Sequence, residues 1–111
     1  MIYDDENVRH ALAPAERDAL HAGYRKLVEE LGATFLGGAP LQKTTTASSV
    51  RVRDGKPQIT DGPFAETREQ LGGYFLIEAS TLAEATAVAA RMPGARVGTI
   101  EVRPLAPMPG E

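Results

Sequence analysis

Hydrophobic positions recur every three or four residues over residues 14–31, and this spacing predicts an amphipathic helix. Pro14 suits the first helical turn, and Gly32 is a typical residue just beyond a helix C-terminus. The apolar side chains that share one face are Leu20, Tyr24, Leu27, Val28 and Leu31. We therefore expect this helix to pack on a sheet through that face and to expose its charged side chains.

A second helical pattern covers residues 82–92 and ends before Pro93. Its apolar face contains Leu82, Ala85, Val88, Ala89 and Met92. Thr81 with Glu84 three residues later is typical of a capping box, although Ser80 is an equally suitable cap.

The remaining segments have the pattern of strands. Residues 33–36 form a short β-prone run that the Gly-Gly-Ala-Pro sequence of residues 37–40 interrupts. Residues 49–60 predict a hairpin with Asp54-Gly55 as its turn, because this dipeptide is a strong hairpin signal. The predicted pairs are Val50 with Ile59, Arg51 with Gln58, and Arg53 with Lys56, with Val52 and Pro57 on the apolar face. Further strands are predicted over residues 1–3, 73–79 and 97–103.

This order of elements predicts one domain over residues 1–111 with a ferredoxin-like α+β sandwich: βαβ, an inserted hairpin, and a second βαβ. Two helices would then cover one face of an antiparallel sheet. The first strand would be central, although three residues are short for that position. Strand alternation places Phe75, Ile77, Ile100 and Val102 toward the helices and Tyr74, Leu76, Glu78, Thr99, Glu101 and Arg103 on the other face.

The composition narrows the class of protein. The 111 residues carry a net charge of −3, 42% hydrophobic residues and no cysteine, which excludes disulfides and thiolate chemistry. We expect a cytoplasmic protein without membrane or nucleic-acid partners, because the chain has no long apolar run, signal peptide or basic patch. No cofactor or metal site is predicted: phosphate-binding fingerprints are absent, and His10 and His21 are expected to be surface groups. The acidic residues 4–6 are expected to form a solvated loop.

Residues 60–74, with the sequence TDGPFAETREQLGGY, resemble the YCII-related family in its DGPF subgroup. The resemblance extends through residues 50–55 and 98–104 and spans nearly the whole chain. The resemblance implies a bacterial protein whose ferredoxin-like protomers pair as a dimeric α/β barrel. It does not imply a particular reaction, because none is established for the family. Members of the family usually begin with further apolar residues, so we expect either a truncated start or a shortened first strand here.

The candidate chemistry lies in two places. Asp61 either pins a local turn or acts as a catalytic carboxylate near Glu66 and Arg68. The polar sheet face is either a solvated, ion-paired surface or a ligand cleft enclosed by a homodimer. The candidate substrate-binding residues are Arg68, Tyr74, Glu78, Glu101 and Arg103.

We expect from these residues that the protein binds or transforms a small polar or anionic molecule, with the Arg103 guanidinium holding an acidic group. The alternative is a non-catalytic dimeric regulatory or interaction module. Direct DNA binding ranks last because the net charge is negative.

Overall fold

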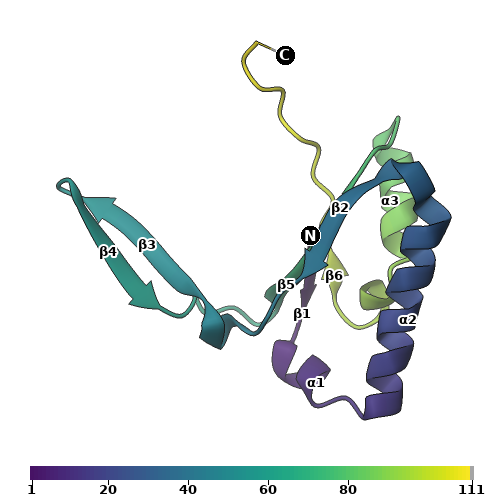
Figure 1. Cartoon of the computed structure of the whole chain (residues 1–111), viewed down its shortest axis with the longest axis horizontal. Helices are drawn as coiled ribbons and strands as arrows, with labels where there is room; N and C mark the ends of the chain where they lie inside the picture. The colour runs from purple at the N-terminus through teal and green to yellow at the C-terminus, as the bar shows by residue number, and fades with distance from the viewer. Residues whose placement is uncertain (111) are drawn as a thin grey trace.

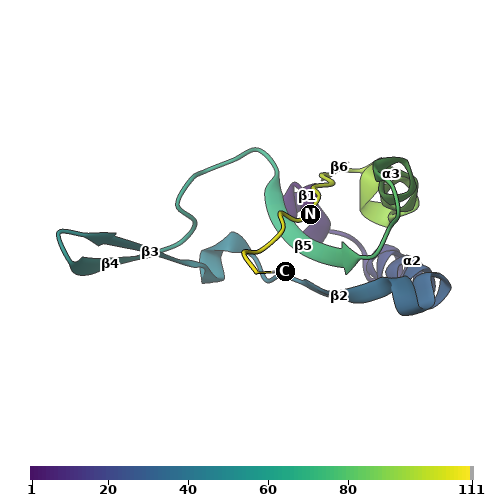
Figure 2. The ribbon, with the colours of Figure 1, turned by 90° about the horizontal axis from the view of Figure 1, so that it is seen from above.

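Two long helices lie on one face of a four-stranded antiparallel sheet, and a separate hairpin projects away from them (Figures 1 and 2). The computed structural model describes residues 1–110. The elements in chain order are β1 (Ile2–Asp4), α1 (Glu6–His10), α2 (Pro14–Leu31), β2 (Phe35–Pro40), β3 (Ser48–Arg53), β4 (Lys56–Asp61), β5 (Gln70–Ile77), α3 (Leu82–Ala90) and β6 (Thr99–Ile100). Short 3-10 helices cover Gly32–Thr34, Thr44–Thr46 and Pro93–Arg96.

The four-stranded sheet has the order β2-β5-β1-β6, and β3 pairs only with β4 in a second sheet. Each pairing is antiparallel, and this order with α2 and α3 on one face is compatible with the predicted ferredoxin-like sandwich. β1 lies between β5 and β6 despite its three residues, which confirms the central position expected for the first strand.

The structure confirms the first predicted helix, the predicted hairpin and one of the two suggested caps of the second helix. α2 covers the predicted residues 14–31, and Gly32 caps its end at a φ of 55°. The hairpin has the predicted register, including Val50 opposite Ile59, and its turn residues Asp54 and Gly55 both have positive φ. Thr81 is the N-cap of α3, because its hydroxyl accepts the Glu84 N–H at 3.1 Å.

The prediction that residues 37–40 interrupt a strand is wrong, because β2 runs through them. A Cβ atom at Gly38 would collide with the carbonyl oxygen of Tyr74, so glycine lets the two strands approach here. β2 is at the edge of the sheet, where Pro40 removes no essential ladder hydrogen bond. The last strand is shorter than predicted: β6 contains Thr99–Ile100, and one further hydrogen bond joins the Glu101 N–H to the Met1 carbonyl.

The acidic residues 4–6 do not form a solvated loop. Asp4 ends β1 and is 7% exposed, and Glu6 begins α1 and is 6% exposed. Between them, the Asp5 carboxylate caps α1 by accepting the N–H groups of Asn7 and Val8. The sequence analysis missed this helix because its five residues are too few for a periodic pattern.

The core between the helices and the sheet is thin. Among the described residues its buried apolar side chains are Leu27, Ala89 and Met92. Phe75 of β5 packs against Phe35 and Tyr24, with ring centroids 5.0 and 5.9 Å away, and joins the sheet to α2. An ion pair between Arg91 and Glu30 links the ends of α3 and α2. No helix within residues 1–110 has the length and apolar character needed to span a bilayer.

We predict that Gly62→Ala lowers the free energy of unfolding by about 1 kcal/mol or more, because Gly62 has a φ of 95°. No atom lies within 4 Å of an added Cβ, so backbone strain alone would produce this loss. Gly62→Asn should lose less, since asparagine adopts positive φ more readily. Urea unfolding measures both variants, and an unchanged midpoint for Gly62→Ala would contradict the prediction.

Candidate functional site

The sheet face opposite α2 and α3, which we call the open face, carries a shallow hollow of about 560 Å³. The residues that line this open-face hollow are Tyr3, Glu69, Thr99, Ile100, Glu101 and Val102. β1 supplies Tyr3 and β6 supplies Thr99, and these two residues are paired across the strands. The Thr99 hydroxyl donates to Glu69 Oε1 at 2.9 Å, which attaches the segment before β5 to the hollow.

The structure brings together two of the predicted site residues at the edge of this hollow. Arg103 Nη2 donates to Glu101 Oε2 at 2.9 Å, and both side chains are accessible to solvent. The N-terminal ammonium of Met1 donates to the carbonyl oxygen of Glu101 at 2.8 Å. Burial lowers the pKa of this ammonium, although the negative charge of Glu101 opposes the shift. The edge of the open-face hollow therefore combines the Glu101 carboxylate with two cationic donors, the Arg103 guanidinium and the Met1 ammonium.

Tyr74 and Glu78 do not belong to the strand next to β6. They belong to β5 and the residues that follow it, and β1 separates β5 from β6. Tyr74 still lies on the open face, 45% exposed, next to the half-buried Phe75. Glu78 follows the end of β5, where its N–H donates to the Thr34 carbonyl at 2.8 Å.

Asp61 and Arg68 lie outside the open-face hollow. Asp61 is the last residue of β4, opposite Ser48, and is exposed. The turn after it is held by other groups: the Gly62 N–H donates to the Ala47 carbonyl at 2.7 Å, and the Ser49 hydroxyl donates to the Gly62 carbonyl at 2.8 Å. The Asp61 carboxylate accepts no hydrogen bond from any residue in 1–110, so it does not pin this turn. Arg68 is exposed in the connector before β5.

Residues 62–70, within the motif of residues 60–74, border a second hollow of about 370 Å³ against the Thr44–Thr46 helix. The residues around this motif-loop hollow are Thr44, Thr45, Gly62, Pro63, Ala65, Glu66, Thr67 and Gln70. Glu66 is the motif carboxylate that the structure places there, whereas Asp61 is not among the lining residues. The other polar side chains of the lining are the threonine hydroxyls and the Gln70 amide.

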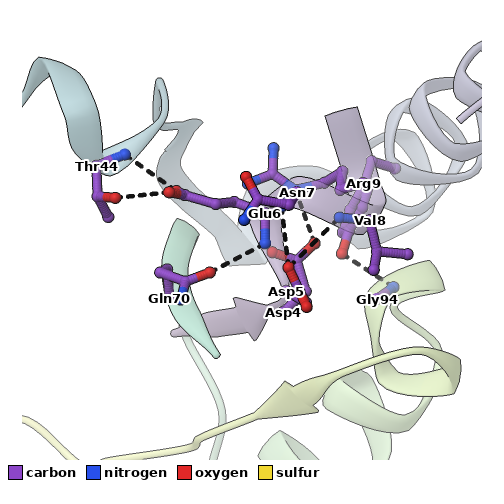
Figure 3. A network of polar contacts seen from close by, with 10 residues as sticks. Asp4, Asp5, Glu6, Asn7, Val8, Arg9, Thr44, Gln70 and Gly94 are labelled. Atoms are coloured by element: carbon purple, nitrogen blue, oxygen red, sulfur yellow. Dashed lines mark hydrogen bonds and ion pairs between the residues drawn. The ribbon is translucent and has the colours of Figure 1, made fainter. Parts of the chain in front are cut away.

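Glu6 forms hydrogen bonds with Thr44 and Gln70, two residues that line the motif-loop hollow (Figure 3). Its carboxylate accepts the Thr44 N–H at 3.0 Å and the Thr44 hydroxyl at 2.5 Å. The Glu6 N–H donates to Gln70 Oε1 at 3.0 Å, and Gln70 Nε2 donates to the Thr67 carbonyl at 2.6 Å. Three distant segments of the chain therefore meet at Glu6: the Thr44 segment at its carboxylate, and the segment that contains Gln70 at its backbone N–H.

The charge of Glu6 is favoured in this setting. Burial alone would raise its pKa, but the hydrogen bonds from the Thr44 hydroxyl and N–H, together with Lys43 and Arg9, hold the pKa below its ordinary value. Sequence reasoning missed this group. The available signal was Asp5 directly before a short helix-compatible segment, which is the pattern of an N-cap.

An ion pair between the partly buried Arg9 and the buried Asp4 fixes α1 to the sheet. Arg9 Nε donates to Asp4 Oδ2 at 2.7 Å. A Cβ atom on Gly72 would press on both side chains, and one on Gly98 would collide with the Tyr3 carbonyl oxygen and press on Asp4. Asp4 Oδ1 and Arg9 Nη2 are buried without a hydrogen-bond partner in the described chain. Neither hollow reaches this pair, so its geometry indicates a structural link between β1 and α1. No group of three or more potential metal-ligating side chains gathers within residues 1–110.

Comparison with known proteins gives two matches. The sequence profile of the YCII-related domain matches residues 1–109. An uncharacterized protein of Rhizobium meliloti (strain 1021) is 41% identical over 114 residues, which cover 96% of this chain and 89% of the relative.

We predict that Glu6→Gln lowers the free energy of unfolding at pH 7 by about 1–3 kcal/mol, because the amide leaves the Thr44 donors without a carboxylate. The folded-state pKa of Glu6 is depressed, so its contribution is present above the ordinary value of 4.5 and disappears as the pH falls through the folded pKa. The difference between variant and wild type should therefore shrink in acid. Urea unfolding across pH measures it, with the exposed Glu29→Gln as control. An equal loss at pH 7 and in strong acid would show that charge is not the cause.

Proposed function

The chain belongs to the YCII-related domain family, and from the geometry of its open face we propose that it binds a small polar molecule there. We place it in the DGPF subgroup of that family on the motif of residues 60–74. A second copy of the chain covers the open face in this proposal, as in a dimeric α/β barrel. The open-face hollow then becomes an enclosed cleft.

The chemistry of the open-face hollow supports a ligand with more than one kind of polar group. Glu69 and Glu101 offer carboxylate oxygens to hydroxyl or ammonium donors. Tyr3 and Thr99 contribute hydroxyl groups. A purely anionic molecule would meet repulsion from the two carboxylates, so a hydroxylated acid or a zwitterion fits the hollow better.

Arg103 is the group that would hold the acidic end of such a ligand. Its guanidinium has five N–H donors, and within residues 1–110 it makes one side-chain hydrogen bond, to Glu101. The remaining donors form a planar fork that matches a carboxylate. Because the ion pair is exposed, breaking or sharing it with a ligand requires little free energy.

The need for a second copy follows from the shape of the hollow. Small-molecule sites commonly bury most of the ligand surface, whereas the open-face hollow has walls only on the side of its own sheet. Two open faces that approach each other would supply the missing wall. Tyr74 and Leu76, which are 45% and 38% exposed on this face, would be covered in the same step.

We predict that a thermal-shift screen with small neutral, anionic and zwitterionic metabolites finds a stabilising compound with an acidic group, and that Arg103→Ala abolishes the shift. In the absence of ligand, Arg103→Ala should change the free energy of unfolding by at most about 1 kcal/mol, because its ion pair is exposed. Arg25→Ala, on the exposed side of α2, is the matched control and should keep the full ligand response.

Retention of the shift in Arg103→Ala would overturn the assignment of Arg103. If no compound stabilises the wild type, the non-catalytic dimeric regulatory or interaction module becomes the better account of the open face. Asp61→Asn adds a separate comparison: loss of the ligand response without loss of stability would move the catalytic or binding role to the motif loop.

A further inference from the structure

We propose that the β3–β4 hairpin, residues 48–61, is a dimerisation arm whose apolar face packs against a second copy of the chain. We call this segment the arm. It projects from the side of the sheet opposite α2 and α3 in both views of the molecule (Figures 1 and 2). The proposal rests on the dimer of the proposed function and adds the segment that holds it together.

The arm has no packing partner within its own chain. Every residue of β3 and β4 except Ser49 is exposed, and neither strand pairs with the four-stranded sheet. Val50, Val52 and Ile59 are 61%, 59% and 69% exposed. An isolated two-stranded hairpin is at best marginally stable in water, so an arm of this kind needs a surface to pack on.

The two faces of the arm differ in the way expected for one buried and one solvated face. Its register places Val50 opposite Ile59 and Val52 opposite Pro57, which gathers the apolar side chains on one side. On the other side Arg53 lies opposite Lys56, and two like charges in direct opposition are tolerated only in water. The apolar face is therefore the one that a partner covers.

The surface area of the chain indicates how much would be covered. A folded monomer of 11.8 kDa exposes about 5,900 Å². This chain exposes 8344 Å², roughly 2,400 Å² more than that expectation. Its radius of gyration is 16.3 Å, against about 13 Å for a compact domain of this length. The projecting arm and the exposed C-terminal residues 103–110 both contribute to this excess. One protomer contributes about 1,000–2,500 Å² to an obligate dimer, so the excess is large enough to include such a share.

A second copy fits the arm better than an unrelated partner does. Two hydrogen bonds hold the base of the arm: the Gly62 N–H donates to the Ala47 carbonyl, and the Ser49 hydroxyl donates to the Gly62 carbonyl. From this base the arm extends away from its own open face. The open face of another copy offers exposed apolar side chains, Leu36 and Leu76 among them. The arm carries three basic and two acidic side chains in a chain of net charge −3, so arm and body also attract each other. A two-fold axis would let both arms make the same contact.

The test uses the full-length protein and two triple variants. Val50→Thr, Val52→Thr and Ile59→Thr make the apolar face polar and keep β-branched side chains, so the hairpin retains its strand propensity. Arg51→Lys, Arg53→Lys and Gln58→Thr alter the opposite face of the same strands without changing its charge and serve as the matched control. Sedimentation equilibrium between 1 and 100 µM gives the dissociation constant of each protein.

We expect a dimer of wild type and control, and a dissociation constant at least about 100-fold higher for the apolar-face variant, since each buried branched side chain contributes roughly a tenfold factor. Amide hydrogen exchange supplies a second readout: residues 48–61 should be protected in the wild-type dimer and lose protection in the apolar-face variant. The other residues should keep their protection, which would show that the fold survives.

The outcomes separate the two proposals. A wild type that is monomeric throughout this range would overturn both the arm and the dimeric cleft. A wild-type dimer with an apolar-face variant that dimerises as tightly as the control would overturn the arm alone and leave the cleft standing. An arm without exchange protection in a wild-type dimer would likewise overturn its role.

Discussion

A sheet has two faces, and the two long helices of this chain cover one of them. The packing of Phe75 between Phe35 and Tyr24 uses the helical side, and it leaves Tyr74 and Leu76 of the same strand exposed. The apolar core that results is thin for a chain of 111 residues. Both the proposed ligand cleft and the proposed arm follow from this imbalance, because each brings a second copy to surface that one copy leaves uncovered.

The charged side chains of residues 4–9 hold together the segments that surround the motif-loop hollow. Glu6 connects α1 to the Thr44 segment and to Gln70 at the start of β5, and these are the segments that carry the motif-loop hollow. The Asp4–Arg9 pair fixes the same helix to the sheet. Buried charges of this kind contribute little net stability when paired, but loss of one partner is costly, so they specify one arrangement of the segments.

The open face and the arm differ in composition and complement each other. The open-face hollow has the charged side chains Glu69 and Glu101 in its lining, and Glu101 pairs with Arg103. The arm presents branched apolar side chains such as Val50 and Ile59. In a dimer the arm would supply the apolar burial that stabilises association, which leaves the polar groups of the open face available to a ligand.

The sequence by itself determined the features that depend on neighbouring residues. The helix over residues 14–31 and the register of the hairpin follow from spacing and turn chemistry, since both are decided within a few residues. The ion pair of Glu101 with Arg103 follows from their alternation along one segment. The tertiary structure decided the features that depend on residues far apart in the sequence. Glu6 is buried where Thr44 and Gln70 bond to it, and Tyr74 of β5 is separated from β6 because β1 inserts between these two strands. No local pattern contains such long-range pairings, which form only when the sheet assembles.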